Sequence, residues 1–242
     1  MQELIVKPLS SDFKIRWVVQ GDTVSKSIQA EIDSIWQKEK TKRGDSIFDG
    51  KLLAFAGLTE SEMQVRTVTY SSFLAQIRKP ELYEELRIES LAVSGLVYSG
   101  SSLAFGKRSA QVTASPGEWE LIPSGSITPT CIGSDGLVRM EEQFFEELEE
   151  ELGVSRARVM HWQPFLFVHD PEIHTIDIGI EAELSTGDKP SKSPQLNEYS
   201  EIRWIETTEI DQFCRKLSAN EPMHNVSRAL LQAKSLAEIP GK

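Results

Sequence analysis

Residues 119–154, WELIPSGSITPTCIGSDGLVRMEEQFFEELEEELGV, hold the pattern that decides the fold. The second half of this stretch predicts one amphipathic helix, because apolar residues recur at steps of three and four. These positions are Leu137, Met140 or Glu141, Phe144, Leu148 and Leu152. Gly153 then ends the helix at a position where glycine readily adopts a positive φ.

A second face of the same helix is acidic. Glu147, Glu150 and Glu151 are spaced i, i+3 and i+4, which places their carboxylates side by side. Like charges at this spacing destabilise an isolated helix, and a cation between them relieves the repulsion. The face is therefore either a solvated acidic surface or a metal site.

The stretch resembles the signature of the Nudix hydrolases, G-x5-E-x7-R-E-U-x-E-E-x-G-U, in which U is a bulky aliphatic residue. EELEEELGV is similar to its end: Glu147 takes the E after R, Glu150 and Glu151 take the E-E pair, and Gly153 takes the closing glycine. Upstream, WELIPSGSI looks like the strand and turn that open the signature, with Gly125 as the motif glycine.

The middle of the stretch departs from the signature. Glu146 stands where the family has Arg, and the family's first Glu falls on Val138 counted back, or on Cys131 counted forward from Gly125. The interval from Gly125 to Glu146 is seven residues longer than the pattern, so the loop carries an insertion. In the family this Arg and first Glu support the loop and do not perform the chemistry. The departures therefore predict a rebuilt loop beside three retained glutamates.

The resemblance implies metal-dependent hydrolysis of a diphosphate linkage in a nucleoside diphosphate joined to another moiety, such as a UDP- or ADP-sugar. It implies a metal site of Glu147, Glu150, Glu151 and Gly125 holding Mg²⁺ or Mn²⁺, which are hard cations that prefer oxygen ligands. The implied catalytic proton acceptor is Glu147 or a loop glutamate such as Glu198. The alternative, favoured by the missing Arg and the longer loop, is a Nudix-fold nucleotide-binding or regulatory domain without turnover.

Basic residues end a predicted strand before the signature, where the family commonly faces a cation toward the substrate cleft. They are Lys107 and Arg108. Arginine binds phosphate through its planar fork, so Arg108 is the better substrate-binding candidate. A solvated strand end is the alternative.

The composition bounds the class of protein. The 242 residues fit one large domain or a domain with an appendage, and no apolar run reaches the ~18–20 residues of a membrane span. Two cysteines, Cys131 and Cys214, form no disulfide framework, which favours a reducing, cytoplasmic setting. The formal charge of −11 opposes binding to nucleic acid or an anionic membrane. A divalent cation nevertheless lets an acidic enzyme bind a small phosphate substrate.

Residues 1–88 are predicted to form a small α+β extension ahead of a main domain at 89–242. We expect strands over 3–9 and 13–20, a helix over 24–42 capped by Asp22 or Thr23, and a further helix broken at Pro80. Asp49-Gly50 is a hairpin signal. The extension loosely resembles those of Nudix enzymes that act on nucleotide sugars, where it helps to form a homodimer or frames the substrate. A purely structural brace is the alternative.

The main domain is predicted to be strand-rich, then helix, strands and closing helices. This order is that of an α+β protein with the Nudix-type α/β/α sandwich on a mixed sheet. A hairpin is expected over 157–184. His169 and His174 flank its turn, and we expect them to be exposed, with a position near a binding loop as the alternative. Residues 185–200 predict a polar surface loop. The resemblance implies that this loop covers the substrate and that Glu198 or Glu201 is a candidate base, and a solvated loop charge is the alternative.

Overall fold

The computed structural model describes residues 3–10, 12–18, 24–44, 47–59, 62–112, 114–185, 187, 189–190, 198–217 and 221–236. The strands are β1 (Ile5–Pro8), β2 (Lys14–Trp17), β3 (Lys51–Leu58), β4 (Glu62–Thr69), β5 (Ser90–Ser99), β6 (Ser102–Arg108), β7 (Trp119–Leu121), β8 (Ser124–Ser126), β9 (Val159–Asp170), β10 (Thr175–Leu184) and β11 (Tyr199–Glu206). The α-helices are α1 (Lys26–Arg43), α2 (Tyr70–Arg78), α3 (Tyr83–Leu86), α4 (Met140–Leu152), α5 (Ile210–Lys216) and α6 (Asn225–Ala233). Short 3₁₀ turns are η2 (Pro80–Leu82), η3 (Pro129–Cys131), η4 (Arg156–Arg158) and η5 (Thr207–Glu209).

The strands of the described residues join one mixed sheet. Its main path runs β1-β9-β10-β5-β3-β4-β2, while β6 pairs with β5, β7 and β11, and β8 pairs with β5. β10 and β5 are parallel, with Ile178 opposite Val93, and β2 and β4 are also parallel. The other pairs are antiparallel. β5 is therefore the strand through which the two halves of the sheet are joined.

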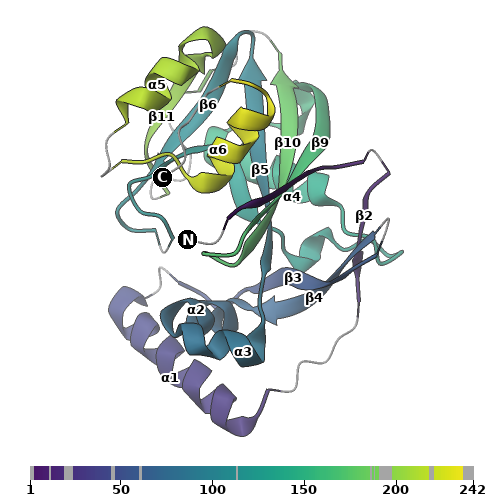
Figure 1. Ribbon diagram of the computed structural model, residues 1–242, viewed down its shortest axis with the longest axis vertical. Helices are drawn as coiled ribbons and strands as arrows, with labels where there is room; N and C mark the ends of the chain where they lie inside the picture. The colour runs from purple at the N-terminus through teal and green to yellow at the C-terminus, as the bar shows by residue number, and fades with distance from the viewer. Residues whose placement is uncertain are drawn as a thin grey trace.

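Two helices cover opposite faces of the sheet at β5 and β10. Figure 1 shows α6 in front of these strands and α4 behind them. A side chain at Gly95 of β5 would meet Phe144 of α4 at 2.8 Å, and one at Gly179 of β10 would meet Leu230 of α6 at 2.4 Å. The helices thus lie close on the strands. The predicted α+β class with a Nudix-type α/β/α sandwich is confirmed.

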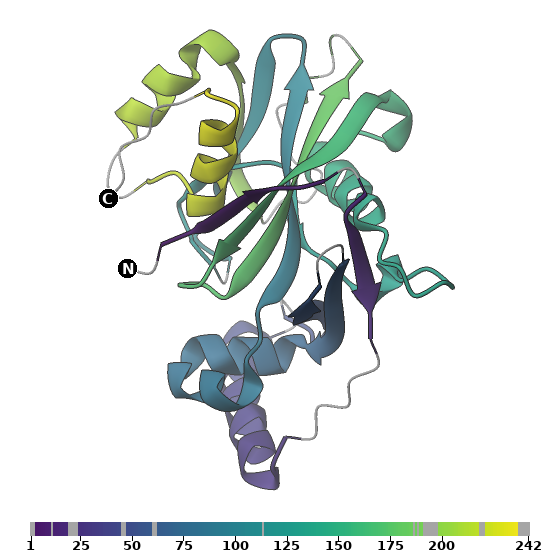
Figure 2. The same ribbon diagram turned by 45° about the vertical axis from the view of Figure 1, so that its right-hand side comes forward.

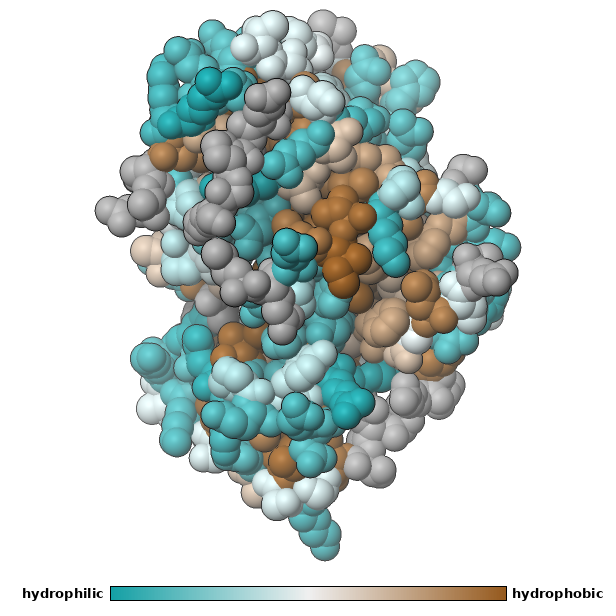
Figure 3. Space-filling model, in the orientation of Figure 1, coloured by the Kyte–Doolittle hydropathy of each residue, from teal (hydrophilic) through white to brown (hydrophobic). Residues whose placement is uncertain are grey.

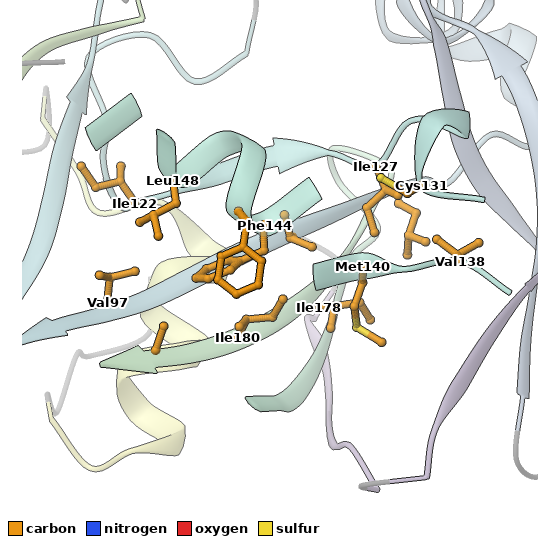
Figure 4. Packing of buried hydrophobic residues seen from close by; sticks show 14 of the residues in the cluster. Val97, Ile122, Ile127, Cys131, Val138, Met140, Phe144, Leu148, Ile178 and Ile180 are labelled. Atoms are coloured by element: carbon orange, nitrogen blue, oxygen red, sulfur yellow. The ribbon is translucent and has the colours of Figure 1, made fainter. Parts of the chain in front are cut away.

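The apolar stripe of α4 fixes the orientation of that helix. Phe144 and Leu148 are fully buried and pack in one cluster with Val97, Ile178 and Ile180 (Figure 4). Burial of such side chains stabilises a fold by about 1.5–3 kcal/mol each. Because this face is held inward, the glutamates on the other side of α4 have a defined direction.

The N-terminal helices form a layer of their own on β3 and β4, drawn at the bottom of Figures 1 and 2. The strands β1 and β2 connect this layer to the rest of the molecule. β1 pairs with β9, with Ile5 opposite His169, and β2 bridges to the segment before α4 through Arg16 and Leu137. Residues 1–88 thus add strands to the same sheet as residues 89–242, and the division at residue 89 remains a prediction.

Helix α1 begins at Lys26 and is capped by Ser25, whose side chain accepts a hydrogen bond from the backbone N of Ile28. Serine at this position satisfies a backbone N–H that has no partner within the helix. The predicted caps Asp22 and Thr23 lie outside the described residues.

Asp49 and Gly50 do not form the turn between β3 and β4, because these strands pair up to Leu58 opposite Met63 and their connection follows Leu58. Instead, the Asp49 carboxylate accepts hydrogen bonds of 2.8 and 2.9 Å from the backbone N and hydroxyl of Ser71, at the start of α2. Asp49 and Gly50 therefore precede β3, and the Asp49 side chain helps to cap α2. The predicted break at Pro80 is confirmed, because η2 begins there.

The surface is mostly hydrophilic over the N-terminal helices and α5, whereas apolar side chains gather at the middle of the face in Figure 3, where β1 lies. Ile5 and Val6 of β1 are 45% and 44% exposed. Within the described residues, every helix is too short or too polar to cross a membrane.

Candidate metal and active site

The acidic face of α4 is only partly exposed to solvent. Glu150 is exposed, Glu147 is half-buried, and Glu151 is buried with 1% of its surface exposed. The helix ends at Leu152, and Gly153 adopts a left-handed φ of 67° as the sequence predicts. Two of the three glutamates are therefore not part of a plain solvated surface.

Strand β8 brings Gly125 directly against Glu147. Gly125 pairs with Val93 in the sheet, and a Cβ at this glycine would lie 2.0 Å from Oε1 of Glu147. Only glycine permits this close approach. The neighbouring backbone N of Ser124 donates to both carboxylate oxygens of Glu151 at 3.3 Å.

Residues outside α4 extend the group of carboxylates. The hydroxyl of Tyr199 lies 2.8 Å from Oε1 of Glu120 on β7 and 3.2 Å from Oε1 of Glu151, within hydrogen-bonding reach of both. Glu198 immediately precedes Tyr199 and interacts electrostatically with Glu120 and with Glu150. The carboxylate cluster, as we use the name, consists of Glu120, Glu147, Glu150, Glu151 and Glu198.

Arg108 supplies positive charge at one side of the carboxylate cluster. Its Nη1 lies 2.5 Å from Oε1 of Glu120 and 4.0 Å from Oε1 of Glu198, and its Nε donates to the carbonyl of Ala114 at 3.0 Å. The Arg108 side chain is 14% exposed. Its guanidinium faces Glu120 and Glu198, so it offsets only part of the charge of the cluster.

Burial away from water disfavours the charged carboxylate of Glu147 and raises its pKa to about 8. The hydrogen bond from Gln143 opposes this rise, whereas the charges of Glu198, Glu150 and Glu146 add to it. A glutamate held in this way binds its proton far more tightly than a solvated one.

Two further members of the cluster behave like Glu147. Burial raises the pKa of Glu151 well above its ordinary value, the charges of Glu198 and Glu147 add to the rise, and the bond from Ser124 opposes it. Burial also raises the pKa of Glu198, against the attraction of Arg108. The cluster is therefore short of positive charge.

The architecture around α4 is shared with a solved structure. The DR0079 protein of Deinococcus radiodurans is similar with a TM-score of 0.51 and 15% sequence identity, over 75% of this chain and 98% of that one. This chain has the Nudix hydrolase fold. At this identity the likeness shows the fold alone.

Two other solved structures are similar to this chain with lower scores. A C. elegans Ap4A hydrolase has a TM-score of 0.40 at 14% identity, over 60% of this chain and 96% of that one. A MutT Nudix hydrolase from Burkholderia pseudomallei has a TM-score of 0.38 at 16% identity, over 59% and 95%. No family model and no curated protein sequence matches this chain.

Residues 132–138, which overlap the predicted insertion, fold into a short tongue that docks on β2. Ile132 and Val138 bridge at its base, and the backbone N of Val138 donates to the carbonyl of Ile15 at 2.9 Å. The backbone N of Trp17 donates to the carbonyl of Gly136, also at 2.9 Å. The tongue thus ties the segment before α4 to β2, a strand from the first part of the chain.

Gln143, one turn before Glu146, fastens residues 128–131 to α4. Its Oε1 accepts hydrogen bonds from the backbone N of Thr128 at 3.0 Å and from Sγ of Cys131 at 3.6 Å. Its Nε2 donates to Oε1 of Glu147 at 2.9 Å. Glu146 itself is exposed. Gln143 therefore connects the loop to Glu147, in a chain that lacks the family's Arg.

The structure separates the basic residues that the sequence proposes as phosphate ligands. Successive side chains of a strand point to opposite faces, so Arg108 turns toward the carboxylate cluster while Lys107 pairs with Glu221 at 2.6 Å. Lys107 is not brought to the cluster. Arg108 is brought there, but Glu120 already engages its guanidinium, and its contact with phosphate stays a prediction.

The two candidate bases near the end of the 185–200 loop lie in different surroundings. Glu198 is half-buried beside Arg108, whereas Glu201 is exposed and pairs with Arg203 at 2.6 Å. Of the two, the structure places only Glu198 at the carboxylate cluster. Residues 191–197 of the loop lie outside the described residues.

The donor set of the carboxylate cluster fits Mg²⁺ or Mn²⁺ in its chemistry, because hard cations prefer carboxylate oxygens and neutralise buried negative charge. Across the described ranges, no three His, Cys, Asp or Glu side chains converge closely enough to ligate an ion as they stand. The hydrogen bonds give the reason. Glu147 is held by Gln143, and Glu151 by Ser124 and Tyr199. An ion would replace these partners.

Sequence reasoning missed Glu120 and Tyr199. The only signal for Glu120 was a charged residue between Trp119 and Leu121 in an apolar strand, where a buried carboxylate needs a partner. Tyr199 lies 79 positions further along the chain. No local pattern links two residues at such a separation.

The prediction of exposed histidines beside the β9–β10 turn is wrong. Nε2 of His169 lies 3.0 Å from Oε2 of Glu89, and Nδ1 of His174 lies 3.1 Å from Oε1. Tyr83 donates its hydroxyl to Oε1 of Glu89 at 2.8 Å. Burial opposes the ionisation of Glu89, but these three bonds outweigh it and hold its pKa below the ordinary range. We call these four residues the Glu89 network.

Proposed function

We propose that this protein hydrolyses a diphosphate linkage in a nucleoside diphosphate joined to another moiety, with Mg²⁺ or Mn²⁺ as cofactor. The observation that carries the proposal is the carboxylate cluster, buried at the helix that bears the Nudix-like motif and only partly offset by Arg108. A UDP- or ADP-sugar is the first substrate to try, and the expected products are two phosphorylated halves.

In this proposal Glu147, Glu150 and Glu151 hold the ion together with Gly125, whose missing side chain leaves room for the Glu147 carboxylate. When bound, the ion neutralises phosphate charge and lowers the pKa of water. Glu147 or Glu198 accepts a proton from the attacking water. A carboxylate in this role must stand within hydrogen-bond reach of that water once substrate is bound.

Other residues of the chain hold these groups in place. Gln143 fixes Glu147 relative to the Nudix loop, and Tyr199 links Glu120 to Glu151. Arg108 keeps one buried carboxylate paired and lies where an additional phosphate oxygen can be attracted. Rigid support of this kind is what a site needs to orient a water molecule and a phosphorus atom.

A nucleotide-binding or regulatory domain without turnover is the second candidate. Two observations favour it: Glu146 replaces the family's Arg, and Glu147 and Glu151 already have partners within the protein. The retained Glu147, Glu150 and Glu151 favour hydrolysis.

The test is a screen of UDP-glucose and ADP-glucose with Mg²⁺ and with Mn²⁺. A phosphatase added afterwards acts only on the phosphomonoesters that cleavage creates, so released phosphate reports the reaction. Glu147→Gln should abolish the signal, whereas Glu149→Gln, an exposed change on the same helix, should keep it. A protein that binds these nucleotides and cleaves none of them with either metal would instead be the binding domain.

A further inference from the structure

A pocket of about 670 Å³ lies between the N-terminal layer and the main sheet. This volume is within the ~300–1,000 Å³ range of small-molecule sites. Its walls come from β1, β3, α3 and β9, and none of its lining residues belongs to the carboxylate cluster. We name it the β3–β9 pocket. Its use does not depend on the proposed hydrolysis.

The walls of the β3–β9 pocket are largely apolar. Phe55 of β3 and Phe167 of β9 are half-buried and line it together with Ile176. Ile5 and Leu58 also line it, and they are 45% and 56% exposed. Large apolar side chains left this open gain free energy when a ligand removes them from water, by about 25 cal/mol for each Å² covered.

The floor of the pocket is polar and already built. Glu89, Tyr83 and His169 line it, and the hydrogen bonds of the Glu89 network hold them. Tyr83 also stacks on His174 with ring centroids 4.4 Å apart. The floor therefore needs no reorganisation before a ligand enters, which lowers the cost of binding.

The rim of the pocket is basic. Lys7, Arg66 and Arg87 line it, against Glu85 and the internally bonded Glu89. Arg66 is buried with 7% of its surface exposed and donates to the carbonyls of Leu86 and Arg87 at 2.8 and 3.3 Å. The lining thus has three basic residues against two acidic ones, so its formal charge is positive.

We propose that the β3–β9 pocket binds a small organic anion with a flat apolar body. The aromatic and aliphatic walls pack against the apolar body, and Lys7 and Arg87 at the rim pair with the anionic group. The position of the pocket between the two layers means that its ligand contacts both. A bound anion therefore holds the N-terminal layer against β9.

The probe is anilinonaphthalene sulfonate, a flat aromatic anion whose fluorescence rises in apolar surroundings. Its neutral analogue phenylnaphthylamine has the same apolar body without the charge. We expect saturable binding of one anion per chain, and affinity about tenfold higher for the anion than for the neutral analogue, as charge complementarity would give.

Two exposed changes locate the site without disturbing the core. Leu58→Gln should weaken both probes about tenfold, and its control Met160→Gln, which changes an equally exposed apolar residue outside the pocket, should weaken neither. Lys7→Glu should remove the preference for the anion and keep the affinity for phenylnaphthylamine. Its control is Lys38→Glu, on the exposed face of α1.

Thermal melts of each variant verify that it is folded before the probes are compared. The proposal is overturned if the anion does not saturate at one per chain. Equal losses in Leu58→Gln and Met160→Gln would also overturn it, because they would show adsorption to apolar surface in general. Equal affinity of the wild type for both probes would refute the anionic character of the ligand.

Discussion

The carboxylate cluster and the Glu89 network both bury glutamate, yet their pKa values move in opposite directions. Around Glu89, three donors reach one carboxylate, and their hydrogen bonds outweigh the effect of burial. In the cluster, burial dominates at Glu147, Glu151 and Glu198, with Arg108 at one side. The chain itself supplies the partners of the first region, whereas the second is left short of positive charge among the described residues.

The two regions also respond to pH with opposite signs. The ionised form of Glu89 stabilises the fold above the ordinary pKa of 4.5, and this contribution is lost as the pH falls through the lower, folded-state value. Glu147, with a pKa of about 8, is stabilising in its protonated form. Its contribution is full below 4.5 and is lost as the pH rises toward 8.

Removing the charge of Glu147 should have the largest effect on activity. If the proposed hydrolysis occurs, Glu147→Gln should lower kcat by about a hundredfold or more, the loss expected for a metal ligand or general base. Single-turnover rates with saturating Mn²⁺ measure it. Glu149→Gln is the matched control on the same helix and should retain kcat. Similar rates for both variants would remove Glu147 from the reacting centre.

Adding Mg²⁺ or Mn²⁺ should raise the thermal stability of the protein by binding at the carboxylate cluster. Mg²⁺ or Mn²⁺ at a hundred times its Kd stabilises a fold that binds it by about 2.7 kcal/mol, so the wild-type Tm should rise and a chelator should reverse the rise. The Glu150→Gln/Glu151→Gln double variant should lose this response. Thermal melts with and without ion decide the point, and an equal rise in both proteins would place the ion elsewhere.

Glu89→Gln should weaken the hydrogen bonds of the Glu89 network. At pH 7 we expect a loss of about 1–2 kcal/mol in the free energy of unfolding, because bonds to a charged group are lost. The difference from wild type should shrink below pH 4.5, as Glu89 takes up a proton. Urea unfolding from pH 3 to pH 7 tests this, with the exposed Glu85→Gln as control. A pH-independent difference would contradict the role given to the charge.

The smallest effect should come from Glu146→Arg. Glu146 is exposed, and its nearest hydrogen-bonding contact is 3.4 Å from Nε2 of Gln143. A change there should alter the free energy of unfolding by no more than about 0.5 kcal/mol, as measured by urea unfolding. An unfolded Glu146→Arg variant would instead show that this position supports the loop.

The sequence predicted what is local in α4. The helix, its buried stripe and its glycine stop follow from spacings of three and four residues, and Met140, Phe144, Leu148 and Leu152 are buried as expected. Leu137, the first residue of the predicted stripe, lies in the tongue before the helix. A stripe shows which side of a helix is apolar but does not fix its first residue.

What the sequence could not predict depends on distant pairs. Lys107 and Arg108 are equivalent in sequence, and only the register of β6 with β7 and β11 decides which one faces the carboxylate cluster. The bonds of His169 and His174 depend on Glu89, 80 and 85 positions away. Such contacts need the whole sheet, which no periodicity in the chain describes.

The pairing of β1 with β9 has a consequence for the order in which the chain folds. Ile5 to Pro8 find their partners at Leu166 to His169, so this edge of the sheet closes only after most of the polypeptide has been synthesised. Pairings between such distant residues slow folding, because the connecting chain must lose entropy first. Until then, Ile5 and Val6 form an apolar strand without a neighbour, which is the kind of segment that pairs with other molecules. Chaperone dependence and aggregation during refolding should therefore centre on the first strand.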